Sequence, residues 1–152
     1  MRNNILNLLP YTGKQIFSRL TFTFLIAAQS IAARNVEITQ FGAVGDAATL
    51  NTKALQMAID TCAETGGGEV TVPPGTYITG TIYLRSNVEL HLCRGSIIRG
   101  SYRNPEDYPT RSLIVADSIE NAGISGSGII DGNAQHPEFQ KNYRLNDGKR
   151  PY

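Results

Sequence analysis

The strongest constraint on the fold is a series of very short strand-like segments separated by Gly, Pro, Asn and Ser. The stretch "GGGEVTVPPGTYITGTIYL", residues 66–84, alternates β-branched runs with glycines and prolines and leaves no room for a helix. Strands this short are unusual in a sandwich, and the helices that a doubly wound sheet needs between its strands are missing. From residue 69 onward the hydrophobic period is two, and we expect strands in EVTV, YITG, TIYL, VELHL, SIIRG, SLIVA, AGISG and GIID.

An internal repeat points to a different architecture. "SNVELHLCRGSIIRGS", from Ser86, and "ENAGISGSGIIDGN", from Glu120, align Asn87 with Asn121 and Leu90 with Ile124. They also align the Ile pair at 97–98 with the pair at 129–130. Repeated short strands with apolar pairs, and Asn or Gly at the corners, are typical of a parallel β-solenoid. We therefore predict an all-β fold that begins a right-handed, single-stranded parallel β-helix.

One amphipathic helix precedes these strands. "TKALQMAIDTCAET", from Thr52, has apolar residues at 54, 55, 58, 59 and 62, which follow the helical period. We expect Asn51 or Thr52 to cap its start and residues 66–68, three glycines, to end it. Because a solenoid needs its open ends covered, we predict that this helix caps the first coil.

The first 33 residues have a different character. They contain Arg2, Lys14 and Arg19, no acidic residue, and then the apolar stretch "LTFTFLIAAQSIAA". A basic start, an apolar stretch short for a bilayer span and small residues at cleavage spacing predict a signal peptide at 1–33 and a secreted or periplasmic protein. An N-terminal anchor or a buried helix is the alternative. Residues 34–152 are then one domain.

Without that leader the chain has 11 basic and 13 acidic residues, so its net charge is about −2. No clustered basic face indicates a nucleic-acid partner, and we expect a monomer with no membrane contact beyond the leader. Five arginines that lie close together could face an acidic polysaccharide, although a mixed, solvated surface is the favoured interpretation. These are Arg85, Arg94, Arg99, Arg103 and Arg111.

The two cysteines, Cys62 and Cys93, could form a disulfide in an exported protein. The helical period places Cys62 on the apolar face, however, and the strand period turns Cys93 outward. We therefore favour two thiols. Neither cysteine has the spacing of a metal ligand.

The acidic residues are scattered. Asp131, in "IIDGN", is the best single catalytic candidate, yet an Asp before Gly at the end of a strand usually makes a local hydrogen bond. Asp46 has the same character, and the adjacent Glu106 and Asp107 are expected to be solvated. No acidic cluster in the sequence indicates a calcium site.

Histidine and tyrosine give no stronger signal. His91 and His136 have no evident carboxylate or nucleophile partner and are expected at the surface. Tyr102, Tyr108 and Tyr143 could stack on sugar rings, but we favour half-buried tyrosines that pack loops onto the solenoid. The sequence thus assigns no catalytic, substrate-binding or metal-binding residue and implies no cofactor.

A long segment of the sequence and two shorter motifs after it resemble a known family. "FGAVGDAATLNTKALQMAIDTCAETGGGEVTVPPGTYITGTIYLRSNVELHLCRGSIIRGS", followed by "DYP" and "NAGISGSGIIDGN", is similar to the start of polygalacturonases, glycoside hydrolase family 28, in the pectate-lyase-like β-helix superfamily. The resemblance covers residues 36–152. It implies the N-terminal part of a secreted hydrolase that cuts pectic polysaccharide, galacturonan or rhamnogalacturonan, with inversion.

The sequence departs from the family pattern in two ways. Ala47 stands where glycine is common and Leu50 where aspartate is common, which affects the turn before the helix. The family's catalytic aspartates, histidine and Arg–Lys pair lie in later coils, and N-T-D, G-H-G and R-I-K are absent here. We expect a domain truncated at its C-terminus and inactive by itself. The alternatives are a non-catalytic β-helix module that binds acidic polysaccharide, and a lyase or epimerase relative.

Overall fold

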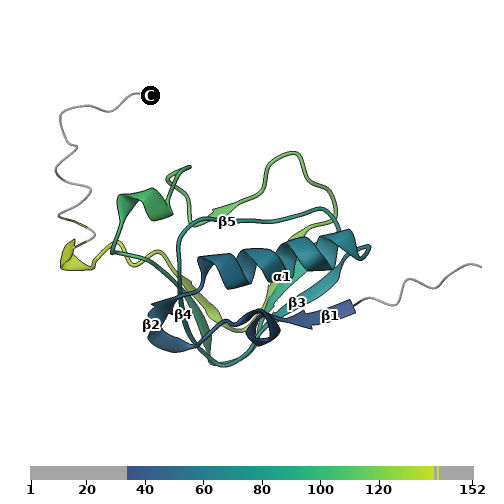
Figure 1. The fold of residues 1–152 in the computed structure, drawn as a ribbon, viewed down its shortest axis with the longest axis horizontal. Helices are drawn as coiled ribbons and strands as arrows, with labels where there is room; N and C mark the ends of the chain where they lie inside the picture. The colour runs from purple at the N-terminus through teal and green to yellow at the C-terminus, as the bar shows by residue number, and fades with distance from the viewer. Residues whose placement is uncertain (1–33, 139, 141–152) are drawn as a thin grey trace, which may run out of the picture. The chain divides into compact units, whose positions relative to one another are not determined.

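Three parallel sheets wind around one another in the computed structural model, which describes residues 34–138 and residue 140 (Figure 1). All of these residues fall within one unit, residues 31–152. The predicted signal peptide at 1–33 lies outside the described residues. In order across the first sheet, the strands are β1 (Arg34–Glu37), β3 (Gly68–Val72), β6 (Val88–Leu92) and β9 (Gly123–Gly126).

The chain returns to each sheet once per coil, so the strands of one sheet come from successive coils. Every strand pair in the described residues is parallel. The second sheet contains β2 (Asp46–Leu50), β4 (Gly75–Thr79), β7 (Ser96–Gly100) and β10 (Ile129–Asp131), and the third contains β5 (Ile82–Tyr83) and β8 (Ile114–Val115).

The register of the ladders confirms the internal repeat. Leu90 pairs with Ile124, and the Ile pair at 97–98 pairs with the pair at 129–130. At the corner before these strands, the Asn121 side-chain amide donates a hydrogen bond to Asn87 Oδ1 (3.1 Å). The parallel β-helix predicted from the sequence is therefore the fold of these residues.

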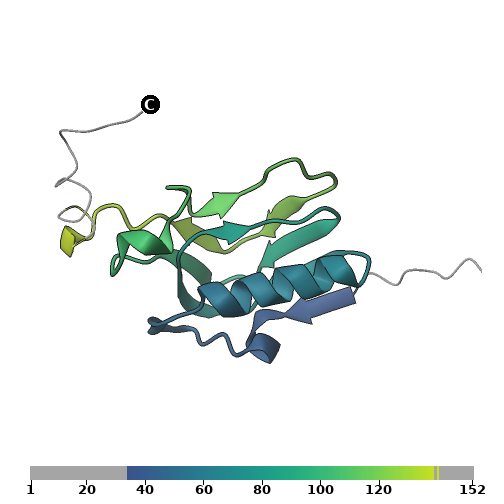
Figure 2. The ribbon, with the colours of Figure 1, turned by 45° about the horizontal axis from the view of Figure 1, so that its top comes forward.

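Helix α1 (Thr52–Glu64) occupies the position of a third strand in the first coil (Figure 2). Among the described residues the third sheet has strands only from the second and third coils, and the side-chain amide of Gln56 bonds the edge of β5 instead. Gln56 Oε1 accepts a hydrogen bond from Tyr83 N (2.8 Å), and Gln56 Nε2 donates one to Tyr83 O (3.0 Å). The helix thus covers the start of the solenoid, as predicted.

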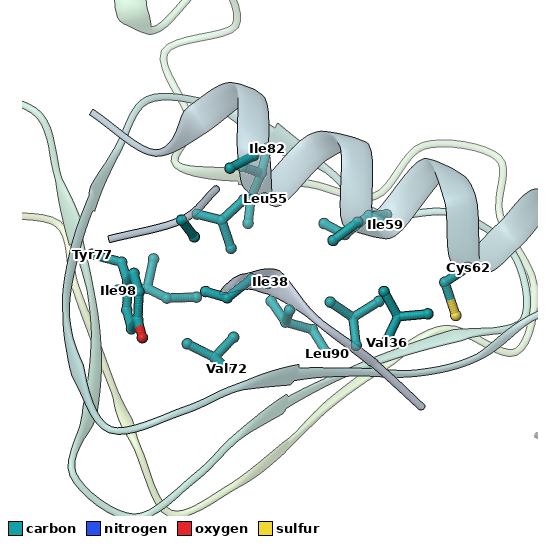
Figure 3. Close-up of a cluster of buried hydrophobic side chains, with 14 of the residues drawn as sticks. Val36, Ile38, Leu55, Ile59, Cys62, Val72, Tyr77, Ile82, Leu90 and Ile98 are labelled. Atoms are coloured by element: carbon teal, nitrogen blue, oxygen red, sulfur yellow. The ribbon is translucent and has the colours of Figure 1, made fainter. Parts of the chain in front are cut away.

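The buried face of α1 completes the core between the sheets (Figure 3). Leu55, Ile59 and Cys62 point from the helix toward the inward residues of the strands. Apolar side chains at alternate strand positions meet them, because successive strand residues point to opposite faces. The buried strand side chains include Val36, Val70, Val72, Tyr77, Ile82, Val88, Leu90, Leu92 and Ile98.

The predicted ends of α1 are confirmed, with Asn51 as the N-cap residue, whose C=O accepts from Leu55 N (2.9 Å). The Asn51 side chain makes no hydrogen bond to the helix N-terminus. Buried Asn51 instead fixes the preceding loop, where its Oδ1 accepts from Val44 N (2.7 Å), while Thr52 Oγ1 accepts from Gly80 N (2.7 Å). At the other end Gly66 has a φ of 102°, and its N–H bonds Ala63 O (3.0 Å), as a glycine C-cap does.

Two local features differ from the sequence expectation. The sequence NVEITQ, residues 35–40, predicts a first strand, but strand β1 ends at Glu37, because residues Ile38–Phe41 form a 3-10 helix, η1. Residues Asp46–Leu50, expected in the turn before the helix, also form strand β2, which pairs with β4 at its two ends, Asp46–Thr76 and Leu50–Ile78, with an irregularity between them. All five β2 side chains are exposed, so the strand has no alternating pattern that the sequence could reveal.

Cys62 and Cys93 form no disulfide bond in the structure, as favoured from the sequence. Cys62 is buried on the inner face of α1, and Cys93 is half-buried after β6. Burial raises the pKa of the Cys62 thiol. No helix among the described residues is long and apolar enough to cross a membrane.

Candidate functional site

Strand register brings Arg99 and Asp131 together at the ends of neighbouring strands β7 and β10. The two residues are ladder partners, and Arg99 Nε lies 2.9 Å from Asp131 Oδ2. Asp131 Oδ1 also accepts a hydrogen bond from Asn133 N (2.8 Å). The local hydrogen bond predicted for Asp131 is confirmed. Its arginine partner was not predicted, although the aligned Ile pairs at 97–98 and 129–130 place Arg99 opposite Asp131.

A polar, open hollow lies beside this ion pair. Its volume is about 620 Å³. Asn133 is fixed there by a hydrogen bond from its Nδ2 to Gly100 O (3.0 Å). A guanidinium and side-chain amides can bind carboxylate and hydroxyl oxygens. The lining residues are Arg99, Asp131, Gly132, Asn133, Ala134 and Gln135.

An aromatic pair follows the same two strands. The rings of Tyr102 and His136 stack with centroids 3.7 Å apart and an interplanar angle of 13°, and the Arg103 guanidinium carbon lies 6.0 Å from the Tyr102 ring centre. Because His136 covers one face of Tyr102, at most the other face can receive a sugar ring. The pair ties the loop after β7 to the segment after β10, which fits the packing role expected for the tyrosines.

The loop at residues 101–111 is held down by another tyrosine. Tyr108 is 8% exposed, and its hydroxyl donates a hydrogen bond to Ser101 O (2.8 Å). Glu106 and Asp107 belong to the 3-10 helix η2 (Pro105–Asp107), where Asp107 O accepts from Thr81 N (2.8 Å). Tyr143 lies outside the described residues.

Asp46 serves as a turn residue, as predicted. Its Oδ1 accepts from Thr49 N (2.7 Å) and Ala48 N (2.8 Å), and its Oδ2 accepts from Thr49 Oγ1 (2.8 Å). These bonds, led by the one from Thr49 N, lower the pKa of Asp46 because they favour the carboxylate form. A carboxylate used in this way shapes the turn and is not placed for acid catalysis.

The five arginines do not share one role. Arg99 pairs with Asp131, and Arg85 Nε lies 2.7 Å from Asp60 Oδ1 on helix α1. Arg94, Arg103 and Arg111 are exposed. This distribution fits the mixed, solvated surface, with Arg99 as the member beside a hollow.

The structure corrects the expectation that His91 lacks a carboxylate partner. His91 lies on the outward face of β6, and Glu69 of β3 and Glu89 of β6 lie beside it. One ligand atom from each of the three residues lies within 4.8 Å of the others. Sequence reasoning missed this cluster because its members are 2 and 20 positions from Glu89, a spacing that has meaning only once the coil length is known.

Comparison with known proteins places residues 33–144 in a described family. They match the model of the family "Rhamnogalacturonase A/epimerase, pectate lyase-like". The chain is 39% identical over 119 residues to an exo-poly-α-D-galacturonosidase of Dickeya chrysanthemi. That match covers 64% of this chain and 19% of the relative, so the chain spans about a fifth of the length of the curated relatives it matches.

Two solved exopolygalacturonase structures are similar in fold to this chain. The family 28 enzyme of Yersinia enterocolitica has a TM-score of 0.65 and 31% identity over 78% of this chain and 30% of its own. The hyperthermoactive enzyme of Thermotoga maritima has a TM-score of 0.61 and 34% identity over 65% of this chain and 25% of its own. Both likenesses support the parallel β-helix.

Proposed function

The chain belongs to the rhamnogalacturonase A/epimerase, pectate lyase-like family, and we propose that it forms the N-terminal part of a secreted glycoside hydrolase that cuts pectic polysaccharide with inversion. The observation that carries this proposal is the 39% identity to a galacturonosidase, which runs through much of the described part of the chain. The parallel coils beneath the helical cap are the structural counterpart of that match.

In this proposal the described residues support and extend a substrate cleft. Inverting hydrolysis needs a carboxylic acid and a carboxylate base about 6.5–9.5 Å apart. Both oxygens of Asp131 are already bonded, by Arg99 and Asn133, and Glu69 and Glu89 approach each other more closely than that range. We therefore assign the acid and the base to carboxyl groups outside the described residues, and expect the 152-residue chain to be inactive by itself.

The hollow beside Arg99 is the part of this chain that we assign to substrate. Galacturonan carries a carboxylate on every sugar, and a guanidinium binds carboxylates with strong hydrogen bonds. The Arg99 side chain is 36% exposed. One edge of its guanidinium can therefore bond a uronate while Nε keeps its hydrogen bond to Asp131.

Binding of short galacturonate oligomers by the 152-residue chain tests this assignment. Arg99→Gln is expected to weaken binding about tenfold, the loss of roughly 1.4 kcal/mol from one charge-assisted hydrogen bond. Asp131→Asn is expected to retain or strengthen binding, because it removes the carboxylate that competes for Arg99.

Arg94→Gln is the matched control, since Arg94 is an exposed arginine before the opposite end of β7. Isothermal titration with galacturonate oligomers, and with the methyl-esterified oligomers as uncharged ligands, gives the comparison. Equal losses for Arg94→Gln and Arg99→Gln would contradict a site at the hollow.

The reaction class is tested on the native product, isolated from the secreted or periplasmic fraction of the source cells. Its intact mass shows how much chain accompanies these residues. Hydrolysis is expected to yield new reducing ends without unsaturated sugars. Products with a ring double bond, which absorb ultraviolet light, would show a lyase instead and overturn the hydrolase proposal.

A further inference from the structure

Three potential metal ligands project from the outer surface of the first sheet. Val70 and Leu90 are buried, so the alternating residues Glu69, Glu89 and His91 point outward. Glu69 and Glu89 are direct ladder partners on strands β3 and β6, and His91 lies two residues along from Glu89. Because all three side chains are on regular strands, the backbone fixes their starting points, and one ligand atom of each lies within 4.8 Å of the others.

The negative charges of Glu69 and Glu89 repel each other and so lower the stability of the sheet. Like charges directly opposite each other on neighbouring strands destabilise a sheet. Among the described side chains the ion pairs are Arg85–Asp60 and Arg99–Asp131, so no lysine or arginine there neutralises Glu69 or Glu89. A bound cation would convert this repulsion into a favourable contact.

Two hydroxyl groups orient the ligands. Ser125 Oγ, on the next strand β9, lies 2.8 Å from His91 Nδ1, which leaves Nε2 as the nitrogen available to an ion. Thr71 Oγ1 donates to Glu69 Oε1 (3.0 Å). The second ring nitrogen of a metal-binding histidine is almost always held by a hydrogen bond, and the Ser125 hydroxyl can supply one here.

The position next to Glu89 is open on one side. Gly123 of β9 is its ladder partner there, and a Cβ added to that glycine would have no atom within 4 Å. Water molecules can therefore complete the coordination of an ion held by three protein ligands.

We propose that Glu69, Glu89 and His91 bind one divalent transition-metal ion, of which Zn²⁺ is the best probe. An imidazole with two carboxylates suits Zn²⁺, whereas Ca²⁺ prefers six to eight oxygen ligands. The ion would join the second coil, through Glu69, to the third, through Glu89 and His91. An ion that binds only the folded chain raises its stability, so the role we assign is a link between coils. This inference is independent of the pectic substrate.

Zinc titration of the 152-residue chain, prepared without a histidine tag, tests the site. We expect one Zn²⁺ per chain by calorimetry and a higher midpoint of thermal unfolding in its presence. His91→Gln is expected to abolish both effects, and the matched control His136→Gln, at the other described histidine, to retain them. Equal behaviour of the two variants, or no binding by the parent chain, would overturn the proposal.

Further variants separate the ligands from their surroundings. Glu89→Gln is expected to lose binding, with exposed Glu120→Gln unchanged, and Ser125→Ala to weaken it about tenfold by releasing the imidazole. Cys93→Ser is expected to bind normally, so loss of zinc in that variant would place the ion on the thiol and reject the triad. Unfolding of each variant without metal shows whether it is folded, so a loss of zinc by a folded variant is a loss of the site.

Discussion

Ala47 adopts a backbone conformation that its side chain disfavours. Its φ is 59°, in the left-handed region, where the Cβ of an L-residue costs roughly 1–2 kcal/mol. The turn begins at Asp46, whose carboxylate accepts the N–H groups of Ala48 and Thr49, so these bonds hold Ala47 in place. The departure from glycine noted in the sequence therefore falls at a position where glycine has a physical advantage.

Ala47→Gly is expected to stabilise the chain by about 0.5–1 kcal/mol, since relief of the strained φ exceeds the extra entropy of glycine in the unfolded state. Urea unfolding measures this difference. Ala48→Gly is the control, because Ala48 is also exposed but has no positive φ, and it is expected to be slightly destabilising. Destabilisation by both variants would show that the turn carries no such strain.

At the residue scale, hydrogen bonds between neighbours in the chain were predicted from the sequence, and contacts between residues of different coils were not. The hydrogen bonds of Asp46 and Asp131 follow from their neighbours in the chain, so a short motif is enough. The Arg99–Asp131 pair joins positions in different coils, and so does the pair of Glu69 and Glu89. Such contacts depend on the ladder register, which the aligned Ile pairs indicated for Arg99 and Asp131 and which no repeat indicated for Glu69 and Glu89.

Helix α1 shows how one element can replace another at the edge of a sheet. The Gln56 amide presents an acceptor and a donor to Tyr83, as the backbone of a strand would. Thr52 does the same for one group, with its Oγ1 accepting from Gly80 N. The helix therefore satisfies polar backbone groups at the start of the solenoid as well as burying apolar surface.

Gln56→Ala is expected to destabilise the chain by about 1–3 kcal/mol, because it leaves the Tyr83 N–H and C=O without their partner in a partly buried position. Met57→Ala, at an exposed neighbouring position of the helix, is the control and is expected to change stability by less than about 0.5 kcal/mol. Thermal and urea unfolding measure both. An effect of Gln56→Ala no larger than that of the control would mean that water replaces the amide.

Elements with alternating burial were predicted well, and elements without it were not. The expected strands VELHL and SIIRG coincide with β6 and β7, whose buried and accessible residues alternate. Strand β2 is exposed throughout, and Thr52, the first residue of α1, bonds the N–H of Gly80, 28 positions along the chain. Local rules describe neither case, since the partners are set by the coil.

For the whole molecule, each coil contacts mainly its neighbours, so stability is expected to vary along the solenoid. β3 and β6 have a bonded strand on both sides in the first sheet, and β4 and β7 do so in the second. β9 and β10 are each bonded on one side among the described strands. The interior of the stack should therefore open less often than its ends.

Hydrogen exchange of the 152-residue chain tests this gradient. Amides of β6 and β7 are expected to exchange more slowly than those of β9 and β10, because the latter lose their partners by opening of a single coil. Amides of β3 and β4 serve as the internal reference for doubly bonded strands. Equal protection of β7 and β10 would show that the free edge of β10 is covered.

The coils differ in length, yet their ladders stay in register. Gly68 pairs with Val88, 20 positions later, whereas Glu89 pairs with Gly123, 34 positions later. The third coil takes up much of its extra length in the loop at residues 101–111, which Tyr108 anchors to the body. Evolution can therefore lengthen or shorten such a corner while the stacked strands inherit their pairing unchanged. The same corner is a natural place to insert a foreign peptide for display.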